Sequence, residues 1–103
     1  MISKNNVLKE DKMKLTKLEM DFLNQILKSE YLEWISEKGF LGDWVCEPFY
    51  NMKTTRGVIS SLLKKGVVDN GGNQKGFHGE EMIWVSINPK YVDVNNYKLK
   101  GVA

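Results

Sequence analysis

The stretch from Thr54 to Val68 constrains the fold more than any other part of this sequence. Its apolar residues recur at helical spacing and predict one inner helix face, formed by Val58, Ile59, Leu62 and Leu63. We expect this helix to run from about Thr55 to Lys65 after a Thr54 cap. Gly66 then ends it, and Val67 and Val68 begin a strand at once. A basic amphipathic helix that leads directly into a strand predicts an α+β domain.

Two further helices are predicted upstream. Thr16 and Glu19 have the spacing of a capping box, and the apolar stripe that follows can extend through Tyr31 and Ile35 to a stop at Gly39. Asp43 can cap a short second helix that runs to about Phe49, although Pro48 must keep it short or broken.

A two-stranded hairpin is predicted downstream. Residues 70–79 are too rich in glycine to be anything but an exposed loop, and residues 81–87 have the β-branched and aromatic content of a returning strand. Asn95 and Asn96 suggest a small turn in the tail. We expect the following residues to be largely buried in the core: Leu18, Phe22, Ile26, Ile59, Leu62, Leu63, Val68, Ile83 and Val85.

Length and composition indicate one globular domain. The chain has 103 residues, of which 42% are hydrophobic and 27% charged. Residues 1–14 read as a flexible polar arm, and residues 15–103 as the folded domain. No apolar run approaches the roughly 20 residues that cross a bilayer, so no membrane partner is expected. The single cysteine, Cys46, is predicted to be a buried thiol, which fits a reducing cytoplasm.

The charges are unevenly distributed along the sequence. Five basic residues lie between Pro48 and Gly79 against one acid, Asp69. Residues 30–47 instead contain five acidic residues against one basic residue, Lys38. A domain with this polarity can turn one face toward polyanions.

The order of the predicted elements and the residues from Thr54 to Val68 resemble a winged helix-turn-helix domain. This stretch is similar to the recognition helix and following strand of MarR-type regulators and of RepL-type plasmid replication proteins. Ile87-Asn88-Pro89 is similar to the end of the wing strand in the RepL type. The resemblance covers about residues 40–90. For the whole domain it implies a winged helix-turn-helix of three helices and a two- or three-stranded β wing.

Double-stranded DNA is the partner that this reading favours. Arg56 is placed for bidentate contact with guanine, while Thr54, Thr55 and Ser60 can bond phosphates or bases. Lys53 and Lys64 suit the DNA backbone, and Lys75 and His78 on the wing can reach an adjacent groove. We therefore expect a sequence-specific transcription regulator or replication accessory of a phage or plasmid.

An enzyme is the least favoured class. His78 has no neighbouring ligands in sequence, Cys46 lies in no recognised metal spacing, and no nucleophile or phosphate-binding motif occurs. No cofactor or metal is expected. The three tryptophans, Trp34, Trp44 and Trp84, are predicted to lie in or at the edge of the core. Phe77 in the wing loop is interpreted equally well as a cap on the core or as a wedge against a partner.

The alternative function is a winged-helix module that binds a protein, such as an inhibitor of a host protein. Gly57, Ser60 and Ser61 form a small, flat outer face that can pack against a protein as readily as enter a DNA groove. A homodimer is also predicted, because one arginine per recognition surface gains affinity when it is doubled on a palindrome. The first helix, extended by Tyr31 and Ile35, is its expected interface.

Overall fold

The computed structural model describes residues 14–30, 32–35, 40–47, 49–76 and 78–100, and these residues form an α+β domain. Its elements follow in this order: α2 (Lys17–Leu27), β1 (Glu33–Ile35), β2 (Phe40–Val45), α3 (Met52–Lys65), β3 (Val68–Lys75), β4 (Glu81–Ile87), the short 3-10 helix η1 (Pro89–Tyr91), β5 (Val92–Asp93) and β6 (Lys98–Leu99). The described residues thus contain two α-helices, not the three that were expected. None of these helices is long and apolar enough to cross a membrane.

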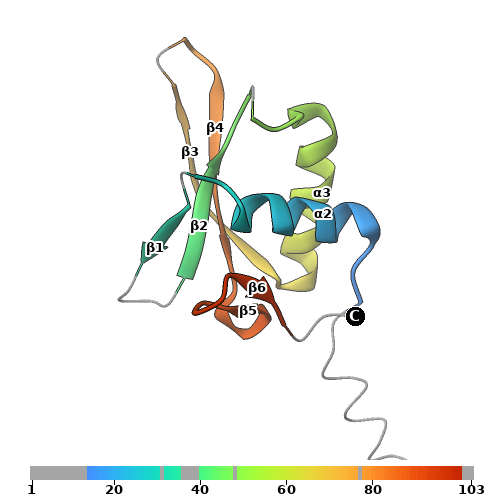
Figure 1. Ribbon diagram of the computed structural model, residues 1–103. Helices are drawn as coiled ribbons and strands as arrows, with labels where there is room; N and C mark the ends of the chain where they lie inside the picture. The colour runs from blue at the N-terminus through green and yellow to red at the C-terminus, as the bar shows by residue number, and fades with distance from the viewer. Residues whose placement is uncertain (1–13, 31, 36–39, 48, 77, 101–103) are drawn as a thin grey trace, which may run out of the picture.

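Four antiparallel strands form one sheet in the order β1-β2-β4-β3. Both α2 and α3 lie against the same face of this sheet, and the end of the β3–β4 hairpin extends past the helices (Figure 1). The β5–β6 hairpin lies at the opposite end, where β6 contacts α2. This tail hairpin confirms the turn predicted around Asn95 and Asn96.

Helix α2 begins as predicted and ends earlier. The capping box is present, because the backbone N–H of Glu19 donates to Thr16 Oγ1 at 3.1 Å and that of Thr16 donates to Glu19 Oε1 at 2.8 Å. The helix ends at Leu27, and Glu33–Ile35 pairs with β2 as a strand, so the predicted helical extension is wrong. The dimer interface was expected on the first helix with this extension, and the helix that is present ends at Leu27. Tyr31 and Gly39 lie outside the described residues.

The second predicted helix is also wrong, because its first residues belong to strand β2. Leu41, Asp43 and Val45 are buried on the helical side, whereas Trp44 is half-buried, which is the period of two that a strand requires. Asp43 pairs with Val85 and Val45 with Ile83 across the sheet. Pairing with a strand some forty residues away overrides the local capping signal of Asp43.

The β3–β4 hairpin is longer than predicted. The ladder continues to the pair Lys75 and Glu81, so only residues 76–80 connect the strands. Gly71 belongs to the strand and makes room for a ring: a Cβ there, or at Gly42 on β2, would collide with the indole of Trp84. Trp84 in turn packs edge-on against Trp44 with 5.4 Å between ring centroids, and both are half-buried as the sequence suggested.

The core lies between the helices and the sheet. Seven of the predicted core residues are buried: Phe22, Ile26, Ile59, Leu62, Val68, Ile83 and Val85. Leu18 and Leu63 were expected there too, but their exposed fractions are 59% and 38%. The inward position at the start of α2 belongs instead to Glu19, which is only 2% exposed. Cys46 is buried, as expected.

Two leucines provide a matched test of this packing. Leu62→Ala should lower the free energy of unfolding by about 2–5 kcal/mol, because it leaves a cavity at a fully buried site. Leu18→Ala makes the same chemical change at an exposed helical position and should cost under about 1 kcal/mol. Urea unfolding of both variants measures the difference, and equal losses would contradict the burial described here.

Candidate nucleic-acid interface

Helix α3 starts three residues earlier than predicted because Asn51, not Thr54, caps it. The Asn51 side chain accepts hydrogen bonds from the backbone N–H groups of Lys53 and Thr54 at 3.1 and 3.4 Å. At the other end Gly66 adopts the left-handed conformation with φ of 76°, as the predicted helix stop requires. Lys53 and Thr54 therefore lie in the first turn of the helix.

A buried carboxylate sets the rotation of α3 about its axis. Glu19 of α2 accepts hydrogen bonds from Ser61 Oγ and, at 2.7 Å, from Lys65 Nζ. Burial by itself would raise the pKa of Glu19, but the hydrogen bonds from Lys65, Ser61 and the Thr16 backbone, together with the Lys65 charge, lower it from 4.5 to about 2. Ser61 and Lys65 thus face α2, and Ser61 is not part of the free outer face.

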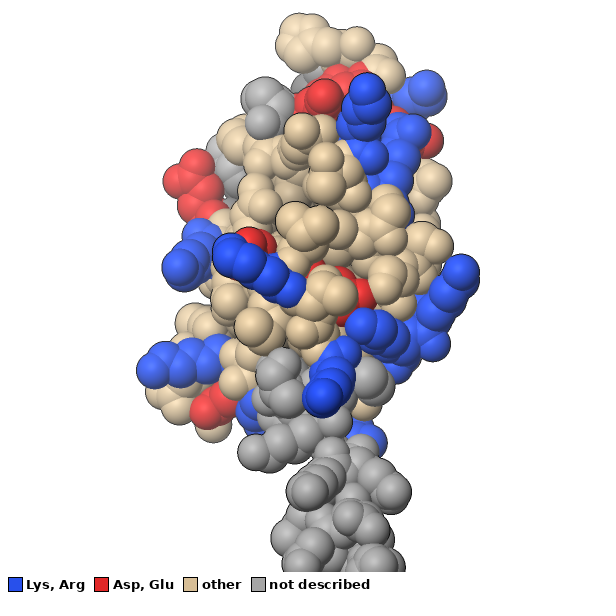
Figure 2. Space-filling model, turned by 90° about the vertical axis from the view of Figure 1, so that its right-hand side faces the viewer, with Lys and Arg blue, Asp and Glu red and all other residues tan. Residues whose placement is uncertain are grey.

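The outward side of α3 is exposed and carries no acidic residue. Its exposed residues include four of the predicted contacts and the glycine between them: Lys53, Thr54, Gly57, Ser60 and Lys64. A Cβ at Gly57 would meet no other atom within 4 Å, so the helix backbone is open to solvent there. On the helical side of the molecule, Lys and Arg side chains are scattered, with Asp and Glu atoms between them, and do not form one dense patch (Figure 2).

Thr55 does not belong to this surface. It is one of the few buried polar residues, on the same side of α3 as Met52, Ile59 and Leu62. Thr55 lies four residues before Ile59 and seven before Leu62, a spacing that puts it on the inner face of the helix. Its proposed contact with DNA is therefore wrong for the folded domain.

Arg56 lies beside acidic residues that the sequence reading left out. Its guanidinium forms an exposed ion pair with Glu81 of β4. The cleft between the start of α3 and the hairpin, about 420 Å³ in volume, is also lined by Lys53, Glu47 and Glu80. Glu80 and Glu81 directly follow the basic stretch between Pro48 and Gly79. They come next to α3 only because the hairpin is folded against that helix.

Lys75 and His78 are exposed but lie apart from the outer face of α3. Lys75 is the last residue of β3 and lines a different hollow, together with Phe49 and Met82. His78 lies in the connection between the strands, where its backbone N–H donates to Glu80 Oε1 at 2.9 Å. The structure therefore unites Lys53, Thr54, Ser60 and Lys64 on one face and leaves the two wing residues separate. Phe77 lies outside the described residues.

No metal centre can be built from the described residues, among which no group of three His, Cys, Asp or Glu side chains is suitably placed. The chain matches no protein-family model, no curated protein and no solved structure. The resemblance to winged-helix proteins therefore rests on the sequence between residues 40 and 90 alone.

Acid titration should reveal the contribution of Glu19. Because its pKa is lower in the folded chain than the ordinary 4.5, its stabilisation is complete above that pH and is lost as the pH falls toward 2. The loss should be on the order of 2–3 kcal/mol. Urea unfolding of the wild type and of Glu19→Gln measures this loss. The pH values should run from about 6 to about 2, because this range spans the unfolded and the folded pKa of Glu19.

The Glu19→Gln variant should be less stable near neutral pH and should show a flatter pH dependence. Asp21→Asn, at an exposed residue of the same helix that pairs with Lys17, is the control and should leave the profile unchanged. Parallel profiles for the wild type and Glu19→Gln would show that Glu19 is not the titrating group.

Proposed function

We propose that the protein binds double-stranded DNA through the outer face of α3, with the β3–β4 hairpin as an adjacent wing. The observation that carries this proposal is the exposed, acid-free side of α3 with Lys53, Ser60 and Lys64 along it. Fourteen residues give a helix of about 21 Å, and a major groove about 12 Å wide admits one such helix. A regulator of transcription or an accessory of replication in a phage or plasmid is the role that we propose for it.

The arrangement proposed here is a variant of the winged helix-turn-helix. A recognition helix followed at once by a hairpin is retained, but strand β2 and the turn that follows it occupy the place of the preceding helix. The buried Glu19 contacts and the sheet therefore support α3 instead. Gly57 permits close approach of the helix backbone to a groove wall.

Binding of a protein by the same helix is the second candidate function. The observation that favours it is the ion pair between Arg56 and Glu81, together with Glu47 and Glu80 in the adjoining cleft. These carboxylates repel phosphates and reduce the affinity of α3 for DNA. DNA titrations at several salt concentrations separate the two candidates. Contacts with phosphates release counterions, so DNA binding by α3 should weaken as the salt concentration rises. A protein-binding surface should show little or no such salt-sensitive binding of DNA.

Two substitutions on α3 should affect DNA binding differently. Lys64→Ala should weaken binding to every sequence and lower the slope of log affinity against log salt by about one, because a phosphate contact carries no sequence information. Arg56→Ala should weaken the preferred site by about 1–3 kcal/mol and leave non-specific binding nearly unchanged. Fluorescence anisotropy with a selected duplex and a random duplex at several salt concentrations measures both effects.

Lys98→Ala, at an exposed lysine of the β5–β6 hairpin, is the control and should match the wild type. If Arg56→Ala keeps the site preference, α3 does not read the sequence. An absence of salt-sensitive binding in the wild type would leave the protein-binding function as the better one.

Glu81 should restrain DNA binding through its ion pair with Arg56. Glu81→Gln removes a charge that competes with the DNA for the guanidinium, and an exposed ion pair is worth about 0.2–1 kcal/mol. The variant should therefore bind the preferred duplex about 1.4- to fivefold more tightly. The double variant Arg56→Ala/Glu81→Gln should lose most of this gain, whereas an equal gain in both backgrounds would refute the competition.

A further inference from the structure

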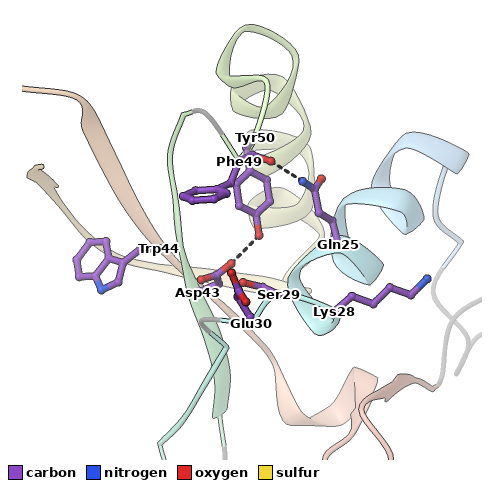
Figure 3. A pocket seen from close by; sticks show the side chains of 8 residues that line it. All are labelled: Gln25, Lys28, Ser29, Glu30, Asp43, Trp44, Phe49 and Tyr50. Carbon is purple, nitrogen blue, oxygen red and sulfur yellow. Dashed lines mark hydrogen bonds between the residues drawn. The ribbon is translucent and has the colours of Figure 1, made fainter. Parts of the chain in front are cut away.

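A groove surrounds Phe49 on a different part of the surface from the outer face of α3. It consists of three adjoining hollows of about 290, 240 and 450 Å³, all of which are lined by Phe49. The first lies between the end of α2 and strand β2 (Figure 3), and the third reaches the tip of the β3–β4 hairpin, where residues 76–80 connect the strands. We call the three hollows together the Phe49 groove.

The groove has an apolar centre. Phe49 is 57% exposed. Its backbone carbonyl accepts a hydrogen bond from Gln25 Nε2 at 2.7 Å, which fixes the backbone there. Half-buried Trp44 and Met82 line the middle hollow beside it. Trp44 points to the opposite side of β2 from Asp43 (Figure 3), so apolar and acidic groups both flank the same strand. A fixed backbone with an exposed ring is the type of anchor that protein interfaces use.

The rim and floor of the groove are acidic. Five carboxylates line it, against two ammonium groups, those of Lys28 and Lys75: Glu30, Glu33, Asp43, Glu47 and Glu80. Four of them come from the acidic segment between residues 30 and 47, which folding gathers along one hollow surface. The negative charge also affects the Cys46 thiol. Burial raises the pKa of this thiol, and the charges of Glu80 and Asp43 raise it further.

Tyr50 fixes the deepest of these carboxylates. Its hydroxyl donates to Asp43 Oδ2 at 2.6 Å, and both groups are buried. Burial raises the pKa of Tyr50, and its hydrogen bond to Asp43 and the charge of that carboxylate raise it further, so the hydroxyl stays protonated as the donor. The acidic floor is thus held in place before any ligand arrives.

Among the described residues, residues 43–45 of β2 form a strand edge without a pairing strand on the side of β1. Strand β1 pairs only with Phe40, Leu41 and Gly42, whereas β4 pairs with β2 as far as Val45. Such an edge can accept an extended chain through backbone hydrogen bonds.

We propose that the Phe49 groove binds an extended, basic segment of a partner protein, in which lysine or arginine side chains alternate with apolar ones. That edge of β2 favours an extended backbone, the carboxylates favour cationic side chains, and Phe49, Trp44 and Met82 favour apolar side chains between them. This site is separate from α3 and does not depend on the proposed DNA binding.

A labelled peptide of alternating lysine and valine provides the test, with an alternating glutamate and valine peptide of equal length as the comparison. Anisotropy titrations should show binding of the lysine peptide only. Phe49→Ser and Glu30→Lys/Glu47→Lys should each weaken it at least about tenfold, because they remove an anchor or reverse charge at exposed positions.

Matched control variants lie elsewhere on the surface. Tyr97→Ser removes another ring, 53% exposed, near the β5–β6 hairpin, and Asp21→Lys reverses an exposed charge on α2. Both should bind the lysine peptide within about twofold of the wild type. Thermal melts of all variants should coincide, which separates loss of binding from loss of fold.

Several outcomes would overturn the proposal. Equal binding of the two peptides would remove the role of the carboxylates, and wild-type affinity in Phe49→Ser and the double lysine variant would place the peptide elsewhere. Self-association of the wild type that Phe49→Ser abolishes would make a second copy the occupant.

One further result would support the proposal. If Phe49→Ser loses peptide binding and retains DNA binding, the protein has two separate binding surfaces.

Discussion

The buried carboxylate of Glu19 is the interaction on which the position of α3 depends. It accepts hydrogen bonds from the start of its own helix and from two side chains of α3 more than forty residues away. A buried carboxylate is costly unless its charge and oxygens are satisfied, so few relative positions of the two helices are acceptable. Since Ser61 and Lys65 must face Glu19, the side of α3 with Lys53, Gly57 and Lys64 faces solvent.

Features that depend on neighbouring residues could be predicted from the sequence. The capping box at Thr16, the inner face of α3 and the stop at Gly66 all rest on contacts within a few turns of one helix. The hairpin from Val68 to Ile87 was predictable for the same reason. At the candidate site, this local information was enough to place Ser60 and Lys64 on the outer face of α3, whereas Lys53 was expected in the turn before the helix.

Features that depend on distant partners could not be predicted. Strand β2 was mistaken for a helix because its pairing with β4 joins residues about forty apart, while Asp43 alone resembles a helix cap. Leu18 is exposed because Glu19 takes the inward position, where hydrogen bonds from Ser61 and Lys65 offset the cost of burying its carboxylate. The pairing of Arg56 with Glu81 likewise requires the hairpin to be folded against α3.

Folding separates the charges of this chain by surface more than its sequence order suggests. Glu30, Glu33, Asp43 and Glu47 gather with Glu80 around Phe49, while α3 presents lysines without acids on its outer side. The cleft with Arg56, Glu47 and Glu81 lies at the boundary between these regions. A polyanion on α3 and a basic peptide in the Phe49 groove would therefore attract each other across this boundary. Glu81 neutralises Arg56 there, whereas Glu47 and Glu80 remain beside the start of α3, so the carboxylates that attract a basic peptide also weaken the attraction of α3 for a polyanion.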